Sequence, residues 1–145
     1  MLALKAAPLT TLSENLVSKE SPIKGLGNDI VEIERIRKSY DNHGQHFLSR
    51  LFSSQEQEYC LKFKDPVPHL AARFSAKESI VKALGTGFGK HISWLDIEIL
   101  NDPLGKPYVT FSENIKQKFA DPQILISISH CQLYVTTTAI WVNAN

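Results

Sequence analysis

The sequence lacks the features that mark several specialised classes of protein. It has only two cysteines in 145 residues, Cys60 and Cys131, which are too few for a disulfide framework and do not show a metal-binding spacing. No apolar run approaches the roughly 20 residues of a membrane-spanning helix. Sixteen basic residues balance fifteen acidic ones, whereas a general polyanion binder is usually more basic. We therefore expect a protein of the reducing cytoplasm that binds neither membranes nor nucleic acid.

The composition that remains suits one folded domain. At 145 residues and 43% apolar content, the chain can bury a proper core. Residues 24–145 are expected to form this domain, and residues 1–23 an N-terminal extension without an assigned role. Within the extension, residues 9–17 favour a short amphipathic helix. Residues 1–9 are apolar but short, and polar residues follow them, so a secretory signal is not expected.

The stretch from Leu70 to Leu84 predicts a helix that carries charge close to its apolar stripe. Lys77 falls inside the stripe, while Glu78 and Lys82 lie on its flank, one turn apart in the favourable acid-before-base order. The segment Gly85-Thr-Gly87 would end the helix. In one interpretation this is an ordinary helix with a surface ion pair, and Lys77 extends to water. In the other, the flank is the wall of a site for a metal ion and a phosphate, which needs a second carboxylate from elsewhere.

Further elements are predicted before this helix. A strand is expected from Ile23 to Val31, followed by a helix from about Glu32 to Tyr40 that ends before His43-Gly44. Asp29, near the end of the strand, could cap that helix or supply a carboxylate to a site. Ser53-Ser-Gln-Glu56 is a capping box that starts another helix. Residues 47–52, just before it, are expected to form a short apolar turn.

The hydrophobic period changes from 3.6 to 2 after Gly89, which predicts strands in the second half of the chain. Strands are expected at residues 95–99, 108–111, 124–129 and 133–142, with a short helix at residues 115–119. The last two strands would be joined by a tight connection at His130-Cys131. This pattern indicates an α+β fold, in which helices pack on one side of an antiparallel β-sheet.

Three segments together carry a family resemblance. They are Gly27-Asn-Asp-Ile-Val-Glu-Ile33, the run from Arg73 to Gly87, and Ile126-Ser-Ile-Ser-His130. In this order they resemble the holo-[acyl-carrier-protein] synthases, the small bacterial type of 4′-phosphopantetheinyl transferase, over about residues 24 to 142. The resemblance implies the fold of that family and a homotrimer with active sites between subunits. It also implies transfer of phosphopantetheine from coenzyme A to a serine of apo acyl carrier protein, as fatty acid biosynthesis requires, with release of adenosine 3′,5′-bisphosphate.

The resemblance further implies a magnesium-dependent catalytic site. It places the first metal carboxylate on Asp29, the second on Glu78, and Lys82 against the diphosphate or the leaving group. Magnesium takes oxygen ligands and is commonly held by one or two carboxylates plus substrate phosphate. Phosphoryl transfer depends mainly on positioning and on neutralising charge, which a metal ion and a lysine can provide. Glu78 is also the candidate general base, either directly or through a metal-bound water.

The resemblance places coenzyme A against the Ser-Ile-Ser-His segment. The residues it implies in this pocket are His130, Ser129, Ser127, Lys77, Gly85 and Gly87, where the glycines would let backbone amides approach the diphosphate. Judged alone, the histidine could equally be an ordinary residue of a hairpin turn.

A basic patch is expected to dock the acidic recognition helix of the carrier protein. Arg35 matches the arginine that serves this purpose in the family, and Lys38, Arg50 and Arg73 are expected to contribute, since complementary charge steers association. A non-catalytic carrier-binding or nucleotide-binding module on the same scaffold is the alternative function. The sequence does not distinguish magnesium from manganese, because both suit oxygen ligands.

Overall fold

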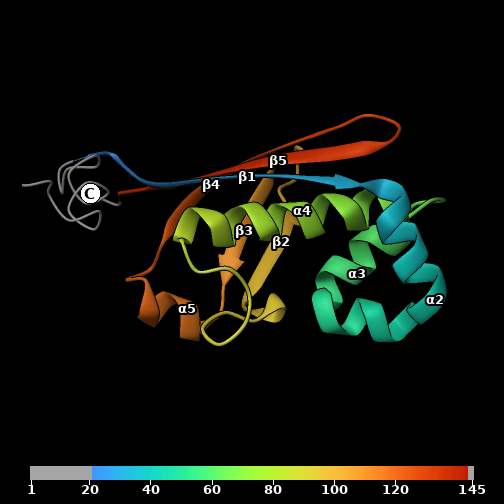
Figure 1. Ribbon diagram of the computed structural model, residues 1–145, viewed down its shortest axis with the longest axis horizontal. Helices are drawn as coiled ribbons and strands as arrows, with labels where there is room; N and C mark the ends of the chain where they lie inside the picture. Colours follow the sequence, from blue (N-terminus) through green and yellow to red (C-terminus); the bar gives the residue numbers. More distant parts are fainter. Residues whose placement is uncertain (1–20, 144–145) are drawn as a thin grey trace, which may run out of the picture.

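The computed structural model describes residues 21–143 (Figure 1), so the helix predicted in the N-terminal extension lies outside the described residues. In chain order the elements are β1 (Ile23–Glu32), α2 (Ile33–Leu51), α3 (Ser54–Leu61), α4 (Val67–Leu84), the 3₁₀ turn η1 (Trp94–Asp96), β2 (Ile97–Asn101), β3 (Pro107–Phe111), α5 (Glu113–Lys118), β4 (Gln123–His130) and β5 (Tyr134–Val142). Mixed helices and antiparallel strands confirm the predicted α+β class.

Helix α4 is the element on which the rest of the fold is assembled. Strand β5 lies between β1 and β4 in a three-stranded antiparallel sheet, and α4 runs along one face of this sheet (Figure 1). Strands β2 and β3 form a separate antiparallel hairpin that contacts α4 and β4. Helices α2 and α3 gather near the first turns of α4, and α5 lies near its last turns (Figure 1).

The ends of α4 follow local sequence rules. Pro68 occupies the first turn, where its missing N–H has no helical partner to lose. Gly85 ends the helix with a φ of 80°, a left-handed conformation that glycine adopts without steric cost, and its N–H bonds the carbonyls of Lys82 and Val81. The predicted start and stop of this helix are confirmed within three residues.

The chain between residues 33 and 51 differs from the prediction. The first helical segment does break at Gly44, close to its predicted end, but residues 47–51 are not a turn, because a second helical segment follows the break and α2 continues to Leu51. Gly44, with φ 48° and ψ −125°, interrupts the helical backbone. The helix resumes beyond it because Leu48 is buried and Phe47 packs against the same core, so tertiary packing restores what the glycine breaks.

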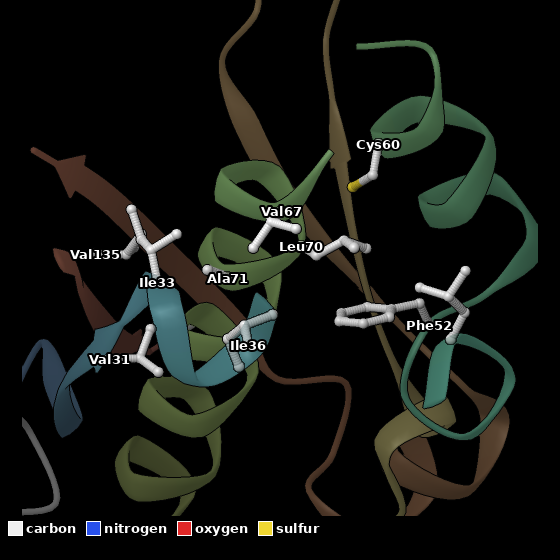
Figure 2. Packing of buried hydrophobic residues seen from close by; sticks show 10 residues of the cluster. Val31, Ile33, Ile36, Phe52, Cys60, Val67, Leu70, Ala71 and Val135 are labelled. Atoms are coloured by element: carbon white, nitrogen blue, oxygen red, sulfur yellow. The ribbon is translucent and has the colours of Figure 1, made fainter. Parts of the chain in front are cut away.

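The core forms two clusters that share α4. The first joins α2, α3 and the first half of α4, and Figure 2 shows Phe52, Cys60 and Leu70 pointing towards one another. The second joins the second half of α4 to the β2–β3 hairpin, α5 and the sheet, with Ile80 and Ile97 fully buried. Any shift of α4 therefore disturbs both halves of the core.

Candidate active site

Strand β1 lies unusually close to α4, and two glycines allow this contact. The strand alternates, so Gly25, Gly27 and Asp29 share the face that looks towards the helix. A Cβ added at Gly27 would lie 1.8 Å from the carbonyl oxygen of Ser79, and one at Gly25 would lie 2.0 Å from that of Ala83. Only residues without a side chain permit this approach, which carries Asp29 to the flank of α4.

Asp29, Lys82 and Glu78 meet where β1 passes α4. The Lys82 Nζ donates to Asp29 Oδ1 at 3.1 Å and to the carbonyl oxygen of Asn28 at 2.9 Å. The Asp29 side chain is largely buried, at 14% exposure, whereas Lys82 is half exposed. The carboxylate therefore sits at the edge of the core with a cation at its open side.

The capping interpretation of Asp29 does not apply. Helix α2 begins after Glu32, whereas Asp29 lies within β1 and is paired with Thr137 of β5. Its carbonyl accepts a hydrogen bond from Thr136 Oγ1 at 3.0 Å. The strand thus fixes the backbone of Asp29 while its carboxylate points to the helix.

The electrostatics of Glu78 reflect its neighbours. Burial raises the pKa of its carboxyl group, and the negative charge of Asp29 raises it further, whereas Lys82 and Arg35 act in the opposite direction. Burial disfavours the charged form, and so does a like charge nearby. The alternative of a simple surface Glu78–Lys82 pair is not what the structure shows, because Lys82 instead contacts Asp29.

The donor set suits a small hard cation. Two carboxylates from different elements face one region, and the mutual repulsion felt by Glu78 is what a divalent ion would relieve. Within residues 21–143 no cluster of three or more acidic, histidine or cysteine side chains is suited to hold a metal. Two carboxylates with water and substrate phosphate are nevertheless a usual set for magnesium. Asp29 and Glu78 therefore fit the ion, with substrate completing the shell.

A separate cavity contains the predicted histidine. It has a volume of about 390 Å³ and lies between α4, the β2–β3 turn and β4. Among the residues that line it are His130, Ser127, His69, Arg73, Asn101 and Pro107. The lining does not include Asp29, Glu78 or Lys82. Within one chain, the predicted site residues therefore lie in two separate places.

Arg73 belongs to this cavity and not to a docking surface. It is 3% exposed, donates to Asn101 Oδ1 at 2.6 Å and stacks over the Tyr59 ring at 4.3 Å. Its Nε is buried without a hydrogen-bond partner among the residues that the structure describes. The predicted contribution of Arg73 to carrier docking is therefore corrected, because the packing of α4 against β2 turns the guanidinium inward. The orphaned donor, which sequence patterns do not reveal, makes Arg73 an anion-binding candidate in the cavity.

Lys77 also differs from its prediction. Its side chain is fully buried and forms an ion pair with Glu56 at 2.7 Å. It neither extends to water nor lines the cavity that contains His130. The helical wheel placed Lys77 inside the apolar stripe, but the acidic partner that allows its burial comes from a helix formed by distant residues.

The remaining predicted residues lie at the surface. Gly85 and Gly87 follow α4 with φ values of 80° and 66° and are exposed. His130 and Ser129 end β4 and are exposed as well. The structure leaves these side chains and backbone amides open to a ligand.

The exposed basic residues of α2 lie on two separate hollows. Arg35 and Lys38 line a groove at the start of the helix. Arg50 lines another, of about 310 Å³, beyond the interruption at Gly44. Arg37 is instead engaged by Asp65 at 2.9 Å. Exposed basic side chains thus occur on both sides of the interruption at Gly44, and Glu32 and Glu34 also line the groove of Arg35 and Lys38.

Comparison with known proteins assigns the family. A family model described as the 4′-phosphopantetheinyl transferase superfamily matches residues 25–139. The chain belongs to this superfamily. A holo-[acyl-carrier-protein] synthase of Protochlamydia amoebophila is 60% identical over 117 residues, covering 81% of this chain and 96% of the relative.

Solved structures agree with this assignment. The holo-[acyl-carrier-protein] synthase from Neisseria meningitidis superimposes with a TM-score of 0.77 at 31% identity, covering 83% of this chain and 99% of that one. The synthase from Helicobacter pylori, solved in complex with coenzyme A, gives a TM-score of 0.74 at 35% identity, covering 80% and 98%. The resemblance carried by the three sequence segments is confirmed, and so is the fold that it implied.

Proposed function

We propose that this phosphopantetheinyl transferase moves 4′-phosphopantetheine from coenzyme A to a serine of apo acyl carrier protein. The observation that carries the proposal is the meeting of Asp29 from β1 with Lys82 and Glu78 from α4. Relatives similar to this chain are holo-[acyl-carrier-protein] synthases, and one of the similar structures holds coenzyme A.

The reaction exchanges one phosphorus–oxygen bond for another. The hydroxyl oxygen of the carrier serine forms a bond to the phosphorus that carries phosphopantetheine. The bond from that phosphorus to the bridging oxygen of the diphosphate breaks, and adenosine 3′,5′-bisphosphate leaves with this oxygen. The serine proton passes to a base, so charge and atoms balance.

The side chains at the meeting point suit these steps. Glu78, whose pKa is raised by burial and by Asp29, is placed to accept the serine proton, directly or through a water. Lys82 carries an ammonium group that can turn from Asp29 to the diphosphate and neutralise charge on the leaving oxygen. Asp29 and Glu78 would hold Mg²⁺, which when bound polarises the diphosphate and offsets its charge.

Coenzyme A needs a further pocket for its nucleotide. The cavity with His130, Ser127 and the orphaned Arg73 Nε presents cationic and polar groups that suit a phosphate. Because its lining excludes the Asp29–Glu78 region, we propose that a second subunit brings the two together. Gly85 and Gly87 would offer backbone amides to the diphosphate.

A homotrimer is consistent with the outer face of the sheet. On the side away from α4, Leu26 and Ile30 of β1 are each 66% exposed, and Leu125 of β4 is 59% exposed. Exposed apolar side chains that share one face of a sheet are suited to an interface with another protein chain. Closed cyclic symmetry would bury this surface and place the same site at each subunit boundary.

The carrier is proposed to dock on α2. Arg35, Lys38 and Arg50 are exposed on this helix, and Arg35 also lies within electrostatic reach of Glu78. An acidic helix bound there would be adjacent to the reacting groups. We propose a cytoplasmic location, in keeping with the free thiols of Cys60 and Cys131. None of the helices within residues 21–143 is long and apolar enough to cross a membrane.

A direct assay tests the function. Apo carrier protein is incubated with coenzyme A and Mg²⁺, with and without a chelator, and analysed by intact-mass spectrometry. The proposal expects a carrier heavier by one phosphopantetheine only when the metal is available. It also expects Asp29→Ala and Glu78→Ala to remove transfer while circular dichroism stays native. An unmodified carrier with the native enzyme would reject transfer, and active variants would reject the assigned metal ligands.

A further inference from the structure

A buried ion pair holds α4 on the side away from the sheet, and the reaction as described does not use it. Lys77 and Glu56 both have side chains with 0% exposure. The Lys77 Nζ donates to Glu56 Oε1 at 2.7 Å, to the carbonyl oxygen of Leu51 at 2.6 Å and to that of Trp94 at 3.1 Å. One ammonium group on α4 therefore contacts the end of α2, helix α3 and the turn η1.

The carboxylate of the pair is equally occupied. Glu56 Oε1 also accepts from the Ser53 N–H at 3.0 Å, which completes the capping box of α3. Its Oε2 accepts from the Ile99 N–H of β2 at 3.1 Å. The two side chains thus connect α4 to α2, α3, η1 and β2, and each of the contacts is directional.

Stability alone does not explain such a pair. A buried ion pair loses hydration at both charges, and well-packed hydrophobic residues of similar volume are often as stable. Hydrogen bonds differ from apolar contacts in that they specify an orientation. The pair is suited to define where α4 lies and how it is rotated.

On the opposite side of α4, fewer buried hydrogen bonds define that orientation. There, Gly25 and Gly27 press backbone against backbone at Ser79 and Ala83. A contact without side chains on one partner has no knobs to set rotation or axial position. The buried Ser75 hydroxyl bonds Thr137 Oγ1 at 2.9 Å, and the half-exposed Lys82 ammonium bonds Asp29 and Asn28 of β1.

We propose that Glu56 and Lys77 are positioning residues that set the rotation of α4, so that Glu78 faces Asp29. Lys77 and Glu78 are neighbours on α4, about 100° apart around its axis, so fixing one orients the other. The proposal rests on the assigned roles of Asp29 and Glu78. It predicts that neutralising the pair lowers the rate of transfer without removing the fold or the binding of substrates.

The test is the double variant Glu56→Gln with Lys77→Met. This variant removes both charges together and keeps the two side-chain volumes close to native. The amide oxygen introduced by Glu56→Gln can still accept from one of the two backbone N–H groups that Glu56 binds, those of Ser53 and Ile99. A single Lys77→Met change is avoided because it would leave a buried charge unpaired. Ile115→Val, a mild cavity in the buried face of α5, is the matched control for loss of stability elsewhere.

The readouts separate positioning from folding. Transfer by the native enzyme and its loss in Glu78→Gln are measured first, so that a failure of the proposed function is recognised independently. The double variant is expected to show native circular dichroism, at least a roughly tenfold lower kcat and a higher Mg²⁺ concentration for half-maximal rate. Its KM values for coenzyme A and carrier are expected to stay within about threefold of native.

Three outcomes for the double variant would overturn the proposal. The first is a folded protein whose kcat stays within twofold of native. The second is a loss carried by KM alone, and the third is a loss of kcat equal to that of Ile115→Val at the same fraction folded. If the double variant does not fold, Glu56→Asp alone decides, because it keeps a negative charge beside Lys77 and changes only the reach of the carboxylate. A native kcat in that variant would equally overturn the assignment.

Discussion

Replacing Gly27 by alanine should separate the two halves of the candidate site. The added Cβ would lie 1.8 Å from the Ser79 carbonyl oxygen and 2.8 Å from the Ala83 backbone nitrogen. Ordinary contact begins near 3.4 Å, so β1 must move away from α4 by about 1.6 Å. Both neighbours are helix backbone, which cannot turn aside as a flexible side chain could.

The magnitude follows from this displacement. Overpacking of a buried contact costs about 1–3 kcal/mol. For a domain of this size, that corresponds to a melting temperature lower by roughly 4–12 °C. The 3.1 Å contact between Lys82 and Asp29 would exceed ordinary ion-pair distance. A misplacement of about 1 Å in an active site can lower the rate about 100-fold, and we expect kcat/KM to fall by this order.

Thermal unfolding and the carrier-modification assay measure the two effects. Lys24→Ala is the control, because Lys24 is an exposed residue of the same strand, and its ammonium lies 4.4 Å from the Trp141 ring. Losing that contact should cost no more than about 1 kcal/mol and should leave transfer intact. A Gly27→Ala enzyme with native melting temperature and native transfer would show that the close approach does not position Asp29.

Four further outcomes are expected. Mg²⁺ affinity, measured by calorimetry, should fall as pH falls through the raised pKa of Glu78, because a protonated carboxyl is a poor ligand; affinity independent of pH between about 4 and 8 would contradict this. Because the pKa of Glu78 is raised in the folded chain, the metal-free folded chain binds more protons than the unfolded chain near that pKa. Its free energy of unfolding should therefore decrease as pH rises through the pKa of Glu78. Arg35→Glu should raise the KM for an acidic carrier by roughly tenfold and spare coenzyme A binding, and an unchanged carrier KM would reject docking at that residue. A thiol reagent should modify Cys131 before Cys60. Cys131 is exposed and backbone hydrogen bonds lower its pKa, whereas Cys60 is buried and burial raises its pKa to about 11. If mass spectrometry of the native protein showed Cys60 modified first, the described packing of Cys60 would be contradicted.

Local patterns determined much of the architecture. The period-2 alternation of β1 places Gly25, Gly27 and Asp29 on one face, and the four-residue spacing of Glu78 and Lys82 places them together on α4. The capping box at Ser53 is present with both of its hydrogen bonds. These features depend on neighbours within a few residues, so the sequence was enough to predict them.

Long-range contacts decided the rest. Gly44 reads as a helix stop, yet burial of Leu48 in the core restarts α2 beyond it. Arg73 faces a cavity because β2 supplies Asn101, and Lys77 is buried because α3 supplies Glu56. A charged side chain is buried or exposed according to which distant partner the fold brings to it, because the cost of removing a charge from water is offset only by such a partner. That information resides in the packing of the elements and not in the pattern of any one of them.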